Sequence, residues 1–287
     1  LYGIDIDTRA AQLASFALLM KAREDDRRLF SNPPKLNIIA LQDSQPERLD
    51  AFSQDLASTG IAQADLQELL DLFEHASTFG SLIQVPEKLA QNLADLETKL
   101  NTALESGDIF SQQSAQELLP LVKQAQLLAK QYDAVIANPP YMGGKGMNTA
   151  LKDFAKKKFP DSKSDLFSMF MERNLKLTNE SGHLGFMTPF TWMFLSSYEK
   201  LRKLLLEKHT LSSLVKPSYT AFFDSAIVAI CAFVVSKTHL GDWKGSFFDL
   251  EYLGSADEQS PRFLKQLKDK SYFLCKNNDF KKIPGSP

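Results

Sequence analysis

YGIDIDTRAAQLASFALLMKAREDDRRLFSNPPKLNIIAL, residues 2–41, combines two short apolar runs with a long stretch of helical periodicity. Tyr2–Ile6 predicts a strand that ends in acidic residues. Thr8–Phe30 predicts a helix whose apolar positions lie broadly on one face, and Leu36–Leu41 predicts a second strand. A strand, a helix and a strand in this order begin a parallel α/β sheet.

The next stretch, residues 45–131, has a different composition, rich in Leu, Ala, Gln and Glu, and predicts only helices. The expected helices cover 46–59, 62–76, 86–105 and 113–131. Two sets of apolar residues each share one helical face: Leu66, Leu69, Leu70 and Phe73, and Leu89, Leu93, Leu96 and Leu100. We expect a packed all-α insertion that takes no part in the chemistry, with a partner-binding or DNA-contacting lobe as the alternative.

The α/β pattern returns after residue 131. We expect strands over 132–137, 182–188, 211–215 and 226–235, helices over 164–177 and 190–208, and a Gly- and Lys-rich loop over 138–160. The predicted fold class is α/β: a Rossmann-like methyltransferase type of sheet, truncated at its N-terminus, with an all-α insertion. The predicted domains are a core of residues 1–44 and 132–240, the insertion 45–131, and a linker, 241–287.

Composition excludes several classes of protein. The 287 residues are 44% hydrophobic, so a disordered chain is excluded, and the net charge of −2 excludes a uniformly basic nucleic-acid coat. Cys231 and Cys275 form no CxxC motif and the histidines show no ligand spacing, so no metal site is predicted. The longest apolar run, Ala226–Val235, is too short to span a bilayer. We expect a cytoplasmic protein.

Asn-Pro-Pro occurs twice, in different contexts. Asn32-Pro33-Pro34-Lys35 follows a helix and a charged turn, which predicts a simple helix stop. Asn138-Pro139-Pro140-Tyr141 follows directly on the apolar strand YDAVIA. Side chains at the carboxyl end of a parallel strand line the ligand crevice of an open α/β sheet, so we expect only the second motif to be catalytic.

The residue types of the second motif suit the transfer of a group to a planar amine. The prolines restrict the backbone around Asn138 and remove two N–H donors. The Asn138 Oδ1 and the Pro139 carbonyl oxygen can then both accept hydrogen bonds from one –NH₂ group, which directs the nitrogen lone pair at an electrophile. Tyr141 can stack on the ring that carries the amine.

Four segments carry a resemblance to a known family. They are LYGIDIDTRAAQLASFALLMKAR, YDAVIANPPY, SDLFSMFMERNLKLTNESGHLGFMTPFTW and SYTAFFDSAIVAICAFVV. The chain resembles the adenine-specific DNA methyltransferases that use S-adenosylmethionine, most of all those of the BREX phage-defence systems, and it is similar to type I and type IIG modification enzymes. The resemblance implies methylation of a flipped adenine in double-stranded DNA, in restriction-modification or phage defence, with defence-system proteins as possible partners.

The resemblance implies roles for individual residues in cofactor binding. Asp5 would bind the ribose hydroxyls of S-adenosylmethionine, and Ile6 would lie against its adenine ring. Asp43 would accept a hydrogen bond from the adenine amine, with Gln42 as the alternative. Asp7 is expected to cap the helix that comes next.

The resemblance also assigns residues to the target base. The catalytic set is Asn138, Pro139, Pro140 and Tyr141. Phe223 would hold the flipped adenine against Tyr141, with Phe222 as its competitor. Independently of the resemblance, the loop after NPPY is basic, and this cluster beside the strand end suits contact of Lys145, Lys156, Lys157 and Lys158 with the DNA backbone, the alternative being an ordinary solvated loop.

The chain departs from the family pattern in one respect. The family has a Gly-rich cofactor loop ahead of the GIDID segment, and here only two residues precede Gly3. We expect the chain to be a fragment whose cofactor loop lies upstream and whose DNA-recognition domain lies downstream of Gly254. On this interpretation the fragment is inactive alone.

Two other functions remain open on the sequence. The NPPY motif also suits a glutamine amide or an RNA base, which would make the protein a glutamine or RNA methyltransferase. A methyltransferase fold kept as a non-catalytic DNA-binding or assembly subunit is the third possibility, although packing alone does not require NPPY. The large insertion and the FF motif favour the DNA enzyme.

Overall fold

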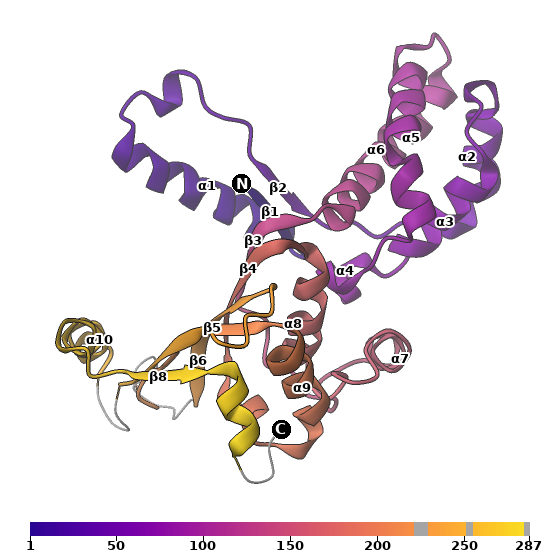
Figure 1. The fold of residues 1–287 in the computed structure, drawn as a ribbon. Helices are drawn as coiled ribbons and strands as arrows, with labels where there is room; N and C mark the ends of the chain where they lie inside the picture. Colours follow the sequence, from indigo (N-terminus) through magenta and orange to yellow (C-terminus); the bar gives the residue numbers. More distant parts are fainter. Residues whose placement is uncertain (221–228, 251–254, 284–287) are drawn as a thin grey trace. The chain divides into compact units, whose positions relative to one another are not determined.

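The computed structural model describes residues 1–220, 229–250 and 255–283, and it contains two compact units (Figure 1). The first unit comprises residues 1–130 and the second residues 131–287. Each unit has its own β-sheet and helices, which confirms the predicted α/β class. Within the described ranges, no helix is long and apolar enough to cross a membrane.

The first unit begins with a two-stranded parallel sheet. β1 (Tyr2–Asp5) pairs with β2 (Asn37–Ala40), and the register places Asp5 opposite Ala40. The crossover is α1 (Thr8–Asp25), and its predicted cap is confirmed because Asp7 accepts a hydrogen bond from the Ala10 N–H at 2.8 Å. Since parallel strands end at the same edge of a sheet, Asp5 and the residues after β2 emerge together.

Helices make up the rest of the first unit. They are η1 (Leu29–Ser31), η2 (Pro46–Arg48), α2 (Leu49–Asp55), η3 (Ala57–Thr59), α3 (Gln63–Phe73), α4 (Ala76–Phe79), η4 (Gly80–Leu82), α5 (Glu87–Glu105) and α6 (Ile109–Ala129). The two predicted apolar faces, on α3 and α5, are buried in one core, which confirms them. Each fully buried Leu contributes about 2 kcal/mol to the stability of that core.

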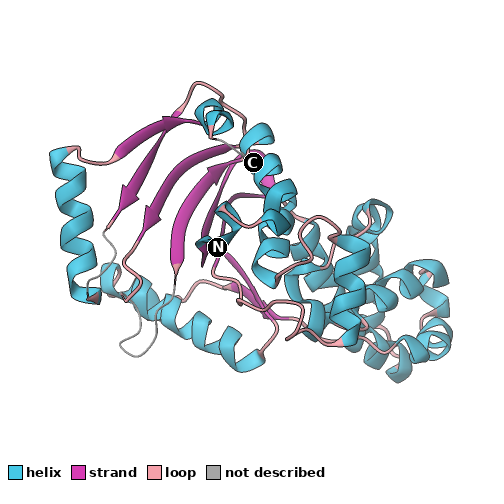
Figure 2. Cartoon of the chain, turned by 90° about the horizontal axis from the view of Figure 1, so that it is seen from below, coloured by secondary structure: helices cyan, strands magenta, loops and turns pink. Residues whose placement is uncertain are grey.

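The second unit is built on a six-stranded mixed sheet in the order β3-β4-β6-β5-β7-β8, and Figure 2 draws its strands in magenta. β3 pairs parallel with β4 and β5 parallel with β7, and the other neighbours are antiparallel. The strands are β3 (Tyr132–Ala137), β4 (Thr178–Pro189), β5 (Thr210–Lys216), β6 (Ile230–Ser236), β7 (Lys244–Asp249) and β8 (Phe273–Lys276).

Two helices cover one face of this sheet and form its core. The helices and turns of the unit are α7 (Thr149–Lys158), α8 (Leu166–Leu177), η5 (Phe190–Met193), η6 (Ser196–Tyr198), α9 (Glu199–Lys208), α10 (Ala256–Asp269) and η7 (Asn277–Lys282). Phe167 and Met171 of α8 and Leu201 of α9 pack with Phe186 of β4 and Phe233 of β6. This packing holds α8 against the sheet, and the first turn of α8 is hydrogen-bonded to the segment after β3.

Four features differ from the sequence expectations. The expected helix over 190–208 is present as two short 3-10 turns, η5 and η6, followed by α9. Among the described residues, β1 pairs only with β2, so the predicted single sheet is present as two sheets. Residues 241–287, expected as a linker, contain β7 and β8, whose short apolar runs become strands by pairing within the sheet. The expected loop 138–160 contains α7, because Asn148 caps a helix there by accepting from the Leu151 N–H at 2.8 Å.

Candidate active site

The Asn138–Tyr141 motif lies directly after a strand, as predicted from the sequence. β3 ends at Ala137, which pairs with Phe186 on the parallel strand β4. Pro139 is buried, whereas Asn138, Pro140 and Tyr141 are exposed. The buried proline anchors the turn, and the Asn138 amide stands at the surface where it can meet a ligand.

Tyr141 lies beside Asn138 and is partly packed. Its hydroxyl is 3.4 Å from Asn138 Oδ1 and 3.3 Å from the Met187 carbonyl oxygen, which are long distances for hydrogen bonds of a hydroxyl. Its ring meets Phe167 edge-on, with 6.5 Å between the ring centroids, and 41% of the residue remains exposed. Burial, aided by the nearby Cys231, raises the pKa of the Tyr141 hydroxyl, so it stays neutral at pH 7. Part of Tyr141 therefore remains accessible to a ligand.

Asp165 fixes the residue that comes after Tyr141. One of its carboxylate oxygens accepts from the Met142 N–H at 3.0 Å and from the Phe167 N–H, in the first turn of α8, at 3.2 Å. The Leu166 N–H in turn donates to the Met142 carbonyl at 3.0 Å. Met142 is therefore held on both sides of its backbone, and the motif is tied to a packed helix.

Of the two roles of Asp165, only the capping of α8 could be predicted from the sequence. An Asp directly before an apolar helical stretch is a recognisable N-cap signal, so the role of Asp165 at α8 could have been predicted. Its bond to Met142, 23 residues earlier, depends on the tertiary fold. Burial raises the pKa of the Asp165 carboxyl even though three backbone N–H groups lower it.

In the first unit, the residues assigned to the cofactor stand at the carboxyl ends of β1 and β2. Asp5 is half-buried, and its Oδ1 accepts from the Asp7 N–H at 2.9 Å. Ile6 is 53% exposed. Asp43 is exposed and accepts two hydrogen bonds from Ser77. The structure thus brings one carboxylate and one apolar side chain to the end of β1 and a second carboxylate to the end of β2.

The residues predicted to contact DNA phosphates lie in α7 and in the turn before it. Lys156, Lys157 and Lys158 are exposed in the last turn of α7, and Lys145 is exposed in the turn before it. Cations in the last turn of a helix also interact favourably with its dipole, which gives these lysines a structural role as well. Lys156 forms an exposed ion pair with Asp153 at 3.1 Å. Phe223 and its competitor Phe222 lie outside the described residues.

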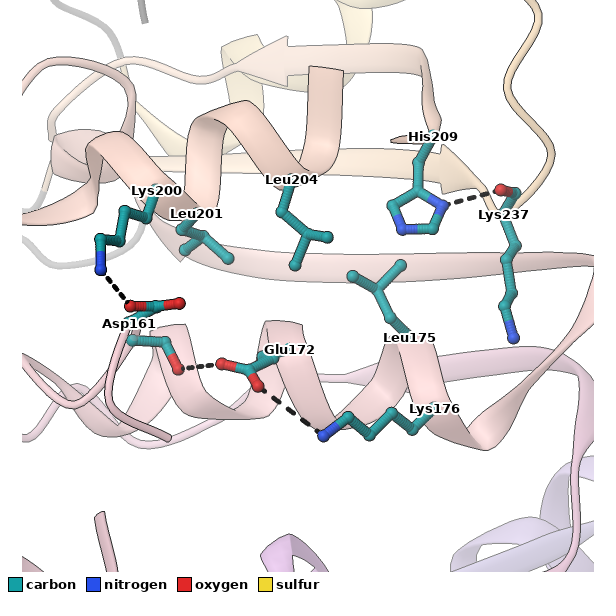
Figure 3. A pocket seen from close by; sticks show the side chains of 10 residues that line it. Asp161, Glu172, Leu175, Lys176, Lys200, Leu201, Leu204, His209 and Lys237 are labelled. Atoms are coloured by element: carbon teal, nitrogen blue, oxygen red, sulfur yellow. Dashed lines mark hydrogen bonds and ion pairs between the residues drawn. The ribbon is translucent and has the colours of Figure 1, made fainter. Parts of the chain in front are cut away.

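A cavity of about 430 Å³ lies between α8 and α9, and none of the predicted site residues lines it (Figure 3). Leu175, Leu201 and Leu204 form its apolar wall. At one end, His209 Nδ1 lies 2.7 Å from the Lys237 carbonyl oxygen, and burial lowers the pKa of that histidine. The cavity is therefore a feature separate from the Asn138–Tyr141 motif.

Comparison with known proteins supports the sequence resemblance. Residues 1–223 match the family described as Eco57I restriction-modification methylase. Over its full length the chain is 42% identical to the adenine-specific methyltransferase BrxX of Escherichia coli O9:H4 (strain HS), covering 26% of that protein. It is also 33% identical over its full length to the adenine-specific methyltransferase PglX of Lacticaseibacillus casei (strain Zhang), covering 24% of that protein.

A more distant relative is the type II restriction enzyme and methyltransferase RM.Eco57I of Escherichia coli. It is 27% identical over 61% of this chain, and the match covers 19% of that enzyme. The chain spans about a quarter of the length of BrxX and PglX. These matches confirm the predicted likeness to the adenine-specific methyltransferases of phage-defence and modification systems.

Proposed function

This chain belongs to the Eco57I restriction-modification methylase family, and we propose that it is the catalytic part of a DNA adenine N6-methyltransferase. The observation that carries the proposal is the Asn138–Tyr141 motif at the carboxyl end of β3, with Asn138 and Tyr141 exposed and the next residue tied to α8 through Asp165. The proposed setting is restriction-modification or phage defence, with double-stranded DNA as the partner. The names of BrxX and PglX support this setting.

The residues assigned to S-adenosylmethionine fit that molecule. In the described part of the chain, one oxygen of Asp5 accepts from Asp7 and the other has no protein partner, so it can accept from ribose hydroxyls. The exposed Ile6 offers an apolar surface to a flat ring. Each carboxylate oxygen has two lone pairs, so Asp43 can accept from an adenine amine while it also holds Ser77.

The proposed mechanism uses hydrogen-bond acceptors in place of a charged base. Asn138 Oδ1 and the Pro139 carbonyl accept from the two N–H groups of the target amine, which draws its lone pair out of conjugation with the ring. When bound, S-adenosylmethionine supplies a methyl group on a positively charged sulfur, which becomes a thioether after transfer. The methylated nitrogen then releases one proton to water.

Tyr141 and the lysines are assigned to holding the DNA. The exposed part of the Tyr141 ring stacks on the flipped adenine, and the contact with Phe167 limits the motion of the ring. In the proposal, Phe223 supplies the opposing aromatic ring. Lys145 and the three lysines at the end of α7 contact phosphates.

The test uses the full-length protein, because this chain spans about a quarter of its relatives. The protein is incubated with labelled S-adenosylmethionine and unmethylated double-stranded DNA, and the DNA is digested to nucleosides. The proposal predicts label in N6-methyl-2′-deoxyadenosine of the DNA digest. Label in added RNA or in a glutamine side chain, with none in DNA, would move the proposal to those substrates. Failure to bind the cofactor would favour a non-catalytic DNA-binding or assembly subunit.

A further inference from the structure

The segment directly after β2 is held by the helical insertion at three consecutive residues. The Gln42 N–H donates to Gln124 Oε1 and Gln124 Nε2 donates to the Gln42 carbonyl, both at 3.0 Å. The Gln124 side chain on α6 is 1% exposed and acts on Gln42 as a neighbouring strand would. The Ser44 N–H donates to the Phe73 carbonyl at 3.0 Å, and its hydroxyl donates to the Leu70 carbonyl.

Between these two contacts, Asp43 is bound by Ser77. The Ser77 N–H donates to Asp43 Oδ1 and the Ser77 hydroxyl donates to Asp43 Oδ2, each at 2.7 Å. Two charge-assisted bonds from one residue fix both the position and the rotation of the carboxylate. Asp43 is exposed, so without Ser77 its side chain would sample several rotamers.

The insertion also reaches the end of β1. Gly80 follows α4 and has φ +57°, a conformation that favours glycine. A side-chain Cβ at this position would lie 3.1 Å from Ile6 Cγ2. Ile6 and Asp43, the two residues assigned to the cofactor's adenine, therefore each contact the same short stretch of the insertion, Ser77–Gly80.

We propose that the insertion is a working part of the cofactor site, in which Ser77 and Gln124 position Asp43 to accept from the adenine amine of S-adenosylmethionine. This inference rests on the proposed function. Ser77 and Gln124 act through other residues, so they are positioning residues. A carboxylate that is already oriented loses less conformational freedom when the ligand binds, and the ligand binds more tightly as a result.

The test measures binding of S-adenosylhomocysteine, an unreactive product analogue, to the full-length protein by titration calorimetry. Ser77→Ala removes the hydroxyl bond at an exposed position and should raise the Kd about tenfold. Ser77→Thr retains a hydroxyl and should restore binding. The matched control is Ser114→Ala, because the buried Ser114 hydroxyl donates to Asp55 at 2.6 Å within the insertion.

A second ligand separates positioning from a general loosening of the site. An analogue with hydrogen in place of the adenine amine cannot donate to Asp43, so Ser77→Ala should change its Kd less than about twofold. Gln124→Ala should weaken S-adenosylhomocysteine in the same selective manner.

Three outcomes would overturn the inference: equal binding by wild type and Ser77→Ala, equal weakening of both ligands, or an equal effect of Ser114→Ala. In each of these the proposed function stands, since the wild type binds. Failure of the wild type to bind would instead remove the proposed function together with the inference.

Discussion

The two Asn-Pro-Pro segments share a tripeptide and differ in everything around it. Asn32 follows the short helix η1, and the chain after it leads into the amino end of β2. All four residues of Asn32-Pro33-Pro34-Lys35 are exposed. Asn138 follows the carboxyl end of β3, Pro139 is buried, and Tyr141 rests against Phe167. The motif proposed to be catalytic thus differs from the helix stop in its position at the carboxyl end of a strand and in its attachment to a packed helix.

Removing the stacking ring has the largest expected effect after loss of Asn138 itself. Tyr141→Ala should lower kcat/KM for methylation about tenfold to a hundredfold, because stacking of a base on an aromatic ring is worth about 1–3 kcal/mol. Tyr141→Phe keeps the ring and loses only two long hydrogen bonds, so it should stay within about threefold of wild type. Steady-state kinetics on a short duplex measures both. A Phe variant as poor as the Ala variant would assign the hydroxyl a role in catalysis.

Freeing Met142, directly after the second motif, should lower the rate less than loss of the Tyr141 ring. Asp165→Ala frees Met142 and should lower kcat about tenfold by loosening Tyr141 and Asn138. Asp165→Asn keeps an oxygen acceptor and should retain most of the rate. Asp108→Ala is the control, because Asp108 also caps a helix, α6, but contacts no predicted site residue. If it slowed methylation equally, general destabilisation would explain the result.

The two Asn-Pro-Pro segments also differ in the proposed role of the lysines that follow them. Changing Lys156, Lys157 and Lys158 together to Ala should weaken DNA binding and reduce the slope of log K against log salt by about 2–3, because each phosphate contact contributes about 0.9. Lys35→Ala, after the first Asn-Pro-Pro, should leave both unchanged. Fluorescence anisotropy over a salt series measures the slope. An unchanged slope in the triple variant would mean that α7 is a solvated helix.

The smallest expected effect is a difference in pH dependence between the two aspartate caps. Burial raises the pKa of Asp165 above 3.8, so the folded state holds this proton more tightly than the unfolded state, and stability falls as pH rises from 3.8 through the raised pKa. Hydrogen bonds from Ser111 lower the pKa of Asp108, so its contribution is present above 3.8 and is lost as pH falls through the lowered pKa.

Thermal melting from pH 3 to pH 7 tests both signs in the full-length protein. The Tm of Asp165→Asn relative to wild type should rise with pH, and that of Asp108→Asn should fall. The same sign for both variants would contradict the account in which partial burial of Asp165 raises its pKa.

The sequence could predict the elements that depend on local pattern. Tyr132–Ala137 is a strand with the predicted bounds, and Leu89, Leu93, Leu96 and Leu100 are buried as their spacing indicated. These features follow from periodicity within a few turns of chain. The position of Asn138 after β3 belongs to the same class, since it requires only the strand and the motif directly after it.

Contacts between distant residues could not be predicted in this way. Ser77 is 34 residues from Asp43, and Gln124 is 82 residues from Gln42, so no local pattern relates them. The insertion, expected to take no part in the chemistry, also holds the segment after β2. The strands β7 and β8 were missed for a related reason, because short runs become strands only when they find a partner.

The rate of methyl transfer in two single variants of the full-length protein tests the central claim most directly. Asn138→Ala should lower the rate of N6-methyladenine formation by about a hundredfold or more, because it removes an acceptor that acts on the reacting amine. Asn32→Ala, the same change in the same tripeptide, should leave the rate unchanged. An active Asn138→Ala, or an Asn32→Ala that is equally slow, would contradict the assignment of catalysis to the motif at the end of β3.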